Sequence, residues 1–596
     1  KLQNKFSTDF DSVEVYPQLN FTASWTKSSE KHFWNSKDFD FEGRYKKENA
    51  ENTSVTPANV QIYLLPFSHN DPGWLRTFEG YFYSKSKHIL NHSVSALPKY
   101  ENMTFAWSEI AFLSKWWDEA SPAQKEVFKE LVTQGRIEIL TGGWVMADEG
   151  TSTLYGLVHQ LTEGHTWLKS NLNFMPNAAW SIDPFGHSST MPYLLKAAGV
   201  DIMVIQVCMK FDFRRINGKK EEHLRYMNFV SSQNLPALAS ALISQYRRTA
   251  SLTQHNIVFT ALGGDFRFEE ALEWEQQYSN YRKLFDYINS RPELEQYHST
   301  AQFGTLASIL IDVIFAFSPS YWSGFYGTRP FWKQLIREVE DELRKTEIIF
   351  TFSYNLLKQR NHPEEVIGHN YDNLVQARRS VALFQHHDGV TGTSPRTTML
   401  DYSKKLTQAW NFLKQIQKVG IEAIWKHELK MEIPPLAEET SRKNHTHTGQ
   451  KNPIKLYENT SVVKKVLLYN SLGWKIPRLV RLVVETLNVT VKGPGGEEVL
   501  SQINLKYDPG SHEPTNQSYE LVFVAKLPPL SVVTYEISQQ VESEASSAKL
   551  AEINCTHCNN LGNSVEGPNI TLENSRFFSP FQQCYWNVGE ITRQVT

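Results

Sequence analysis

Residues 60–74 read VQIYLLPFSHNDPGW, and this stretch decides the fold class. Its first part, Val60–Phe67, is an unbroken apolar run, which is typical of a parallel strand buried on both faces. The run ends at a polar turn that contains His69 and Asp71. Because ligands of α/β proteins gather where parallel strands end, we expect a functional site at this turn.

The segments that follow alternate between helical and strand patterns. The expected elements are helices over 84–97, 109–117 and 122–134 and a strand over 137–140. This alternation predicts an α/β domain with a mainly parallel sheet over residues 58–330. Residues 331–430 carry long apolar and charged periodicity at helical spacing, which predicts a helix bundle.

The two remaining regions differ in composition. Residues 1–57 are polar with short charge runs, and we expect a stem or arm there. Residues 431–456 contain Pro, Ser, Thr and His and are typical of a linker. Residues 457–596 hold short alternating segments separated by turn signals such as Gly493–Gly496, which predicts a β-sandwich-like, all-β region. We expect this β region to be incomplete.

Composition excludes several classes of protein. The 596 residues are 40% hydrophobic and 21% charged, as in soluble globular proteins with roughly three to four domains. The formal net charge of -3 argues against nucleic acid as a main partner, because phosphate binding needs a concentrated basic face. No apolar run approaches the ~20 residues of a membrane span. The four cysteines, Cys208, Cys555, Cys558 and Cys584, exclude a disulfide-dense scaffold.

Acceptor sites for N-glycosylation are distributed unevenly. They stand at Asn20, Asn52, Asn91, Asn102, Asn444, Asn459, Asn488, Asn516, Asn554 and Asn569. None falls between Asn102 and Asn444, so the pattern favours a secretory-pathway protein with a compact, glycan-free middle. The alternative is that so short a motif recurs by chance. The chain begins at Lys1 without a signal-like segment, so we expect any targeting element to have been removed or not included.

The polar turn after the first strand has the residues of half a metal site. His69 and Asp71 are two positions apart, so in extended backbone both side chains leave the same face. An imidazole nitrogen and a carboxylate oxygen on one face can bind a divalent ion. The alternative is a His–Asp hydrogen bond that only closes the turn.

Three further segments combine acids or histidines with small residues. They are Trp180–His187 with Asp183, Leu262–Arg267 with Asp265, and Leu383–Thr393 with His386, His387 and Asp388. Adjacent residues diverge in regular backbone, so we do not expect His386 and His387 to bind the same ion.

Together these groups predict a metal-assisted hydrolase. A borderline ion such as Zn²⁺ accepts mixed nitrogen and oxygen ligands and leaves room for substrate oxygens. Two carboxylic acids in distinct surroundings are what glycoside hydrolysis requires. A glycosidase is therefore the preferred interpretation, and the residues alone do not name the sugar.

Long motifs that occur in order carry a resemblance to a known family. They are HNDPGW at 69–74, TGGWVMADE at 141–149, WSIDPFGHSSTMPYLLKAAG at 180–199, LGGDFRF at 262–268, YWSGFYGTRP at 321–330 and LFQHHDGVTGT at 383–393. Over most of residues 58–430 the chain resembles the class II α-mannosidases of glycoside hydrolase family 38, above all the Golgi α-mannosidase II type.

The resemblance implies zinc-dependent, retaining hydrolysis of terminal α-1,3- and α-1,6-linked mannose from N-glycan intermediates. It also implies the Golgi lumen as location, with a type II membrane anchor in the full-length form. The zinc ligands would be His69, Asp71, Asp183 and His387. Asp183 would be the nucleophile and Asp265 the general acid/base. The substrate-binding residues would be Trp74, Phe185, Trp322 and Asp388.

The chain departs from the family pattern at two places. A substrate-contacting block normally follows Gln206, but the chain continues directly into 207–213, and residues 307–319 replace another usual segment. An alternative function is therefore an impaired or inactive family remnant that retains at most zinc or glycan binding. A weaker alternative is another zinc-dependent carbohydrate hydrolase such as a deacetylase, because His-x-Asp chemistry is shared.

Overall fold

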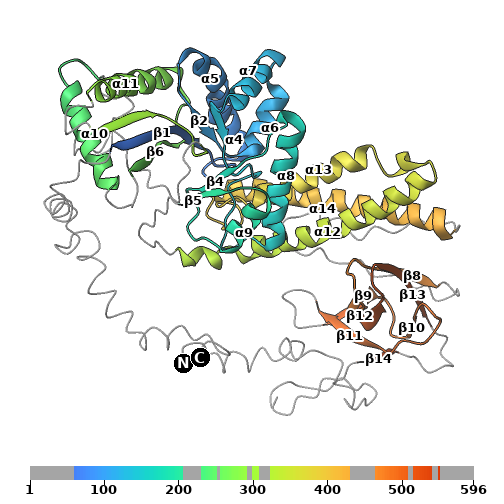
Figure 1. Cartoon of the computed structure of the whole chain (residues 1–596). Coiled ribbons are helices and arrows are strands. Elements are labelled where there is room, and N and C mark those ends of the chain that lie inside the picture. The colour runs from blue at the N-terminus through green and yellow to red at the C-terminus, as the bar shows by residue number, and fades with distance from the viewer. Residues whose placement is uncertain are drawn as a thin grey trace, which may run out of the picture. The chain divides into compact units, whose positions relative to one another are not determined.

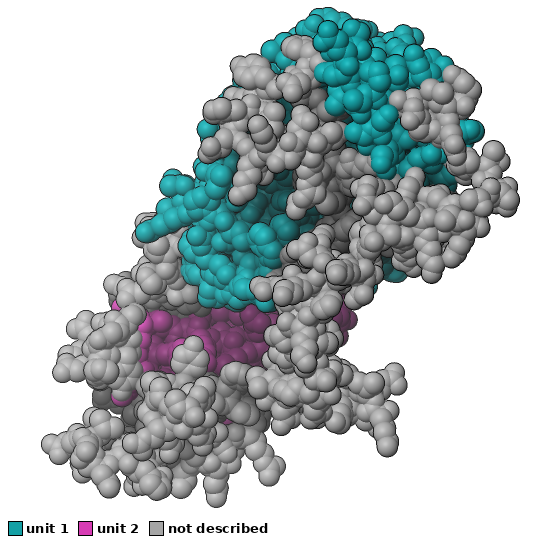
Figure 2. Space-filling model, turned by 90° about the vertical axis from the view of Figure 1, so that its left-hand side faces the viewer, with its two compact units in different colours: residues 1–341, 375–409 teal, residues 342–374, 410–596 magenta. Residues whose placement is uncertain are grey.

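The computed structural model describes residues 59–205, 230–250, 256–291, 298–307, 322–429, 463–507, 514–539 and 548–550. The predicted stem (1–57), the predicted linker (431–456) and all four cysteines lie outside these residues. The chain divides into two compact units, one of residues 1–341 and 375–409 and one of residues 342–374 and 410–596 (Figure 2). The domain boundaries expected from the sequence stay predictions.

A parallel sheet organises the first unit. Its strands are β1 (Val60–His69), β2 (Phe105–Trp107), β3 (Ile137–Ile139), β6 (Ile257–Asp265) and β7 (Ser299–Phe303), and β4 (Ala178–Ser181) pairs separately with β5 (Ile202–Ile205). Strand β1 pairs with β6 along one edge and with β2 and β7 along the other, always in parallel (Figure 1). The predicted parallel α/β fold is confirmed.

The apolar run that predicted β1 is buried as expected. Every residue from Leu64 to His69 is buried, in keeping with a strand covered on both faces. Phe67 packs edge-on against Trp180 of β4, with ring centroids 4.8 Å apart. These two rings belong to one apolar cluster that also contains Leu65 and Ala106, so β1, β2 and β4 share a core.

Helices flank this sheet. They are α4 (Phe78–Tyr81), η3 (Phe82–Ser86), α5 (Lys87–Ala96), η4 (Leu97–Lys99), α6 (Ile110–Glu119), α7 (Pro122–Thr133), α8 (Leu154–Leu172), α9 (Thr190–Ala197), α10 (Leu235–Ala250), α11 (Ala271–Asn289) and η7 (Ser323–Tyr326). Helix α7 starts at a capping box of Ser121 and Gln124 with Pro122 in the first turn. The helix expected over 84–97 is divided into a π-turn, α5 and a 3₁₀ turn that contains Pro98.

The helical region expected after residue 330 is present. It consists of α12 (Pro330–Gln359), η8 (Pro363–Glu365), α13 (His369–Phe384), α14 (Arg396–Ile424) and η9 (Trp425–Leu429). Helices α12, α13 and α14 each contribute residues to both units. No helix among the described residues is long and apolar enough to cross a membrane.

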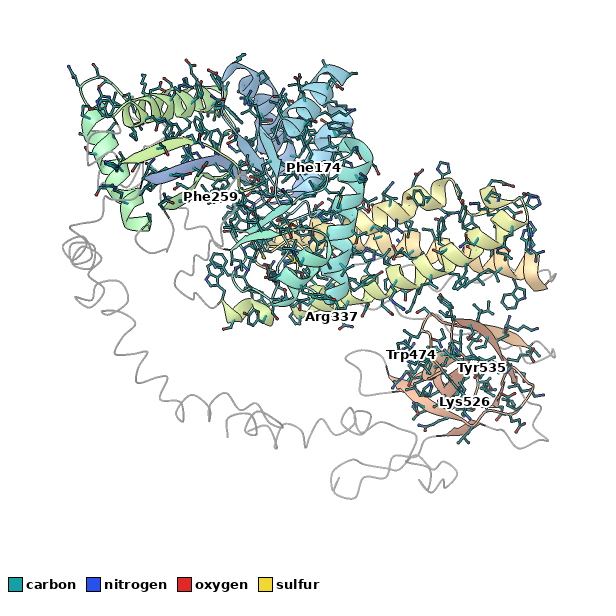
Figure 3. All side chains as sticks on the ribbon, in the orientation of Figure 1. Phe174, Phe259, Arg337, Trp474, Lys526 and Tyr535 are labelled. Atoms are coloured by element: carbon teal, nitrogen blue, oxygen red, sulfur yellow. The ribbon has the colours of Figure 1, made fainter. Side chains whose placement is uncertain are left out.

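The second unit also contains mostly antiparallel β structure. Its strands are β8 (Lys464–Asn470), β9 (Ile476–Val484), β10 (Val489–Lys492), β11 (Ser501–Tyr507), β12 (Pro514–Leu527), β13 (Ser531–Gln539) and β14 (Ala548–Leu550). They form the sheets β10-β13-β8 and β14-β11-β12-β9. Side chains of both sheets share one apolar core, which includes Phe523 and Tyr535 (Figure 3). The predicted β-rich C-terminal part is confirmed for the described residues.

Candidate active site

The end of β1 presents His69 and Asp71 on one face. His69 Nε2 lies 2.9 Å from Asp71 Oδ1, and both side chains are almost fully buried. Asn70 points the other way, where its amide oxygen accepts a hydrogen bond from Ser86 Oγ at 2.8 Å. The alternation expected from extended backbone is therefore present. This contact alone is compatible with half a metal site and with a hydrogen bond that only closes the turn. The surrounding residues distinguish the two interpretations.

The loop after Asp71 is held by a tyrosine from α14. The Tyr402 hydroxyl donates to Pro72 O at 2.7 Å and lies 2.9 Å from Gly73 O. Gly73 has φ +114°, and its N–H donates to Asp71 O at 2.7 Å. A positive φ at this position favours glycine. The turn that carries Asp71 is thus fixed from within and from the neighbouring helix.

Asp183 approaches the same place from the end of β4. The Trp180 indole N–H donates to Ser108 Oγ at 2.6 Å, and the Trp180 N–H and carbonyl both bond to Thr141 Oγ1. These contacts fasten the end of β4 next to the end of β2. Asp183 Oδ2 then lies 3.4 Å from His69 Nε2.

His387 comes from the loop after α13, which pairs with residues 146–148. His387 Nδ1 lies 2.8 Å from Met146 O, and the Asp148 N–H donates to Gln385 O at 2.9 Å. A hydrogen bond from Nδ1 leaves Nε2 free to act as a metal ligand. The TGGWVMADE motif at 141–149 therefore has a structural role, because it positions His387.

Four ligand atoms converge from three distant segments. His69, Asp71, Asp183 and His387 each offer one such atom, and all of these lie within 4.8 Å of one another. Around this ring, the remaining contacts are 3.4 Å from Asp71 Oδ1 to His387 Nε2 and 3.0 Å from His387 Nε2 to Asp183 Oδ2. Ligand atoms about 2.1 Å from one ion stand about 3.0–3.4 Å apart at ordinary coordination angles.

The donor set fits a divalent cation. Two neutral imidazoles and two carboxylates balance a charge of two, and such mixed ligands suit a borderline ion. His69 Nε2 and Asp71 Oδ1 are buried 2.9 Å apart, yet among the described residues neither atom makes a well-aligned hydrogen bond. Buried polar atoms in native proteins are nearly always satisfied, so these atoms indicate a ligand.

Electrostatics within the cluster agree with close charge pairing. Burial alone would raise the pKa of Asp71 and Asp183, but the histidines hold both pKa values far below the usual range. Burial alone would lower the pKa of His69 and His387, but the two carboxylates raise both. Without an ion the cluster therefore favours protonated histidines, and an ion bound there would replace those protons.

His386 does not diverge from its neighbour as expected. His386 Nε2 lies 3.5 Å from Asp71 Oδ1, the atom that His387 Nε2 approaches to 3.4 Å. Residues 385–391 form turns rather than a helix or strand, so the alternation of regular backbone does not apply. His386 Nε2 also lies 3.4 Å from Asp388 Oδ2, which places Asp388 at the edge of the cluster.

Asp265 ends β6 beside the cluster. It pairs in register with His69, and the next residue's N–H donates to His69 O at 2.8 Å. Asp265 is exposed as a whole residue, but partial desolvation of its carboxyl group and the nearby charges of Asp71 and Asp183 raise its pKa, although His69 opposes them. Asp183 and Asp265 thus have pKa values shifted in opposite directions, as a nucleophile and a proton donor require.

Aromatic side chains stand near this edge of the sheet. Phe185 follows Asp183 and stacks on Trp322, with ring centroids 3.9 Å apart and planes 5° from parallel. Trp322 is 48% exposed, and its free area offers a flat apolar surface. Trp74 is half-buried in the loop after Asp71, and no described contact joins it to the Phe185–Trp322 pair.

Three residues that support the cluster were not predicted from the sequence. Glu109 lies behind His69, Met146 O accepts from His387, and Tyr402 holds the loop after Asp71. Glu109 stands two residues after β2, as Asp183 stands two residues after β4, and this position was the signal available in the sequence. Backbone carbonyls and distant tyrosines leave no such local pattern.

The two departures from the family pattern fall mostly where nothing is described. Residues 206–213 and 308–319 lie outside the described residues. The cluster is built without them, because its ligands come from β1, the end of β4 and the loop after α13.

Comparisons with known proteins match most of residues 59–424 to two domain families. Residues 59–313 match the glycosyl hydrolases family 38 N-terminal domain, and residues 320–424 match the alpha mannosidase middle domain. Alpha-mannosidase 2 of Spodoptera frugiperda is 33% identical over 90% of this chain and 54% of its own length. Alpha-mannosidase 2 of Homo sapiens is 31% identical over 88% of this chain and 53% of its own length. The chain spans about half the length of these relatives.

Solved structures share the fold. An α-mannosidase from Enterococcus faecalis V583 superposes with a TM-score of 0.55 at 13% identity, covering 83% of this chain and 57% of that chain. A second Enterococcus faecalis protein, from glycosyl hydrolase family 38, gives a TM-score of 0.51 at 12% identity, covering 81% and 54%. At such identities the likeness concerns the fold alone.

Proposed function

Because this chain belongs to glycosyl hydrolase family 38, we propose that it is a zinc-dependent, retaining α-mannosidase. Its substrates would be N-glycan intermediates with terminal α-1,3- and α-1,6-linked mannose. The observation that carries the proposal is a pair of aspartates with oppositely shifted pKa values beside the His69, Asp71, Asp183 and His387 cluster.

Asp183 would act as the nucleophile. Its Oδ2 faces the two histidines, so its other carboxylate oxygen, Oδ1, would attack the anomeric carbon while the glycosidic C–O bond breaks. Asp265 would give its proton to the leaving oxygen. In the second step Asp265 would take a proton from water, which attacks the same carbon and releases mannose and the Asp183 carboxylate with net retention.

The remaining residues would bind and orient the sugar. His69, Asp71, Asp183 and His387 would hold zinc, which would supply a Lewis acid for the mannose hydroxyl groups. Asp388 would accept hydrogen bonds from mannose hydroxyls, and the Phe185–Trp322 pair would offer its exposed face to a sugar ring. Trp74 would complete the wall of the sugar site.

The cellular setting belongs to the same proposal. The N-glycosylation motifs and the proposed N-glycan substrate favour the Golgi lumen. The resemblance to the Golgi α-mannosidase II type adds the expectation of a type II membrane anchor in the full-length form. An inactive family remnant is the competing function, and it is favoured by the departures at 207–213 and 307–319.

Hydrolysis of an aryl α-mannoside by the full chain separates the two functions. We expect turnover that is abolished by a chelator, restored by zinc and lost in Asp183→Asn. Asp118→Asn, an exposed aspartate on α6, is the matched control and should retain full activity. Stoichiometric zinc binding without turnover would refute the enzyme and support the remnant. Acetate release from acetylated sugars would support a deacetylase.

A further inference from the structure

Glu109 is a buried carboxyl group without a described partner. It follows β2 and precedes α6, its exposure is 0%, and neither carboxylate oxygen has a hydrogen-bond partner among the described residues. Glu138 on neighbouring β3 is also buried, but it accepts the N–H groups of Leu306 and Ala307 at 2.7 Å each. A buried carboxyl group without a hydrogen bond costs free energy, so Glu109 requires an explanation that the hydrogen-bonded Glu138 does not.

The Glu109 carboxyl group lies near Nδ1 of His69, one of the four cluster residues. His69 Nδ1 lies 4.0 Å from Glu109 Oε1, and both side chains are 1% exposed. His69 Nδ1 likewise has no hydrogen-bond partner among the described residues. The two residues meet because β1 and β2 are parallel neighbours and both lie just beyond the pairing of Phe67 with Ala106.

The two histidines of the cluster differ in how their rings are held. Nδ1 of His387 is paired with the Met146 carbonyl at 2.8 Å. Nδ1 of His69 has no hydrogen-bond partner among the described residues, and it lies 4.0 Å from Glu109 Oε1. A metal-binding imidazole needs its second nitrogen protonated and hydrogen-bonded, which fixes the tautomer and the ring orientation.

We propose that Glu109 is a positioning residue whose carboxylate accepts a hydrogen bond from His69 Nδ1–H and so presents Nε2 to the metal ion. The 4.0 Å contact is within ion-pair distance, and the proposed hydrogen bond requires the two atoms to approach to about 3 Å when the ion is bound. The inference rests on the proposed function only in taking a divalent ion as the occupant of the cluster.

Zinc affinity of the 596-residue chain tests this role without catalysis. The probe is Zn²⁺, titrated into metal-free protein in competition with a chromophoric chelator. Glu109→Gln keeps the shape of the side chain and removes its charge, and we expect zinc to bind about 10–100-fold more weakly. Glu109→Asp keeps the charge on a shorter side chain, so it should lose less zinc affinity than Glu109→Gln. This second variant also serves if the glutamine variant does not fold.

The matched control is Glu138→Gln, a buried carboxylate of the same sheet that does not touch the cluster. It should lower thermal stability of the metal-free chain and leave zinc affinity unchanged. Wild-type zinc affinity in Glu109→Gln, or an equal loss in Glu138→Gln, would overturn the positioning role. A chain that shows the expected affinities but no mannoside turnover would refute the proposed function and leave this inference standing.

Discussion

Replacing Gly73 by alanine should disturb both the stability of the first unit and its metal cluster. A Cβ atom at Gly73 would lie 2.3 Å from Tyr402 Oη and 2.8 Å from Tyr402 Cζ, and the backbone has φ +114°. Backbone strain for a side chain at such a φ costs about 1–3 kcal/mol, and overpacking of a buried contact costs about 1–3 kcal/mol more. We expect the free energy of unfolding to fall by about 4 kcal/mol.

Gly135→Ala separates the two contributions. Gly135 also has a positive φ, +68°, but a Cβ there meets nothing within 4 Å. Its cost should therefore be the backbone strain alone, about 1 kcal/mol. Urea denaturation followed by tryptophan fluorescence compares both variants with the wild type. Equal losses in the two variants would refute the steric reasoning.

Tyr402→Phe completes the test. It removes the oxygen nearest the added Cβ, so the double variant should lose less stability than the sum of the single losses, by about 1 kcal/mol. Gly73 also lies two residues after Asp71 and donates to its carbonyl. We therefore expect weaker zinc binding in Gly73→Ala and unchanged binding in Gly135→Ala. Strictly additive stability losses would contradict a direct contact between positions 73 and 402.

Three further predictions concern catalysis, pH and glycosylation. Asp265→Asn should slow hydrolysis of alkyl α-mannosides by about 10²–10⁴-fold, and it should slow hydrolysis of substrates with good leaving groups less. Equal losses of rate on the two kinds of substrate would contradict the role of Asp265 as a general acid. Although burial opposes it, the positive charges of neighbouring lysines lower the pKa of Glu342 to about 2, against 4.5 for a free glutamate. The ionised Glu342 carboxylate therefore contributes about 3 kcal/mol to the free energy of unfolding at pH 7, and this contribution is lost as the pH falls from 4.5 toward 2. In urea denaturation, the stability difference between the wild type and Glu342→Gln should therefore be smaller at pH 3 than at pH 7. A pH-independent deficit would contradict the pairing. Asn102 and Asn488 are exposed, whereas the Asn91 amide oxygen accepts two internal hydrogen bonds. Peptide mapping of secreted protein should therefore find glycans at the first two and none at Asn91.

Local sequence patterns predicted much of the fold. Residues Leu64–Phe67 are all buried, as in a parallel strand covered on both faces, and this burial is visible in the sequence as a continuous apolar run. The same-face placement of His69 and Asp71 follows from the period of extended backbone. The chemical types of the cluster residues were therefore visible before any spatial information.

Contacts that depend on distant segments left no such mark. The rings of His386 and His387 lie together because residues 385–391 turn, and no periodicity describes a turn of that kind. Glu109 faces His69 only because β2 lies next to β1 in the sheet, and the Met146 carbonyl supports His387 through the backbone alone. Spatial neighbours of this type are set by topology rather than by local composition.

The most direct measurement for the whole account is diffraction from crystals of the zinc-treated chain, recorded on both sides of the zinc absorption edge. We predict one anomalous peak, in contact with His69 Nε2, Asp71, Asp183 Oδ2 and His387 Nε2. A zinc-treated crystal without a peak among these four side chains, or with the peak bound elsewhere, would contradict the claim that they form one metal site.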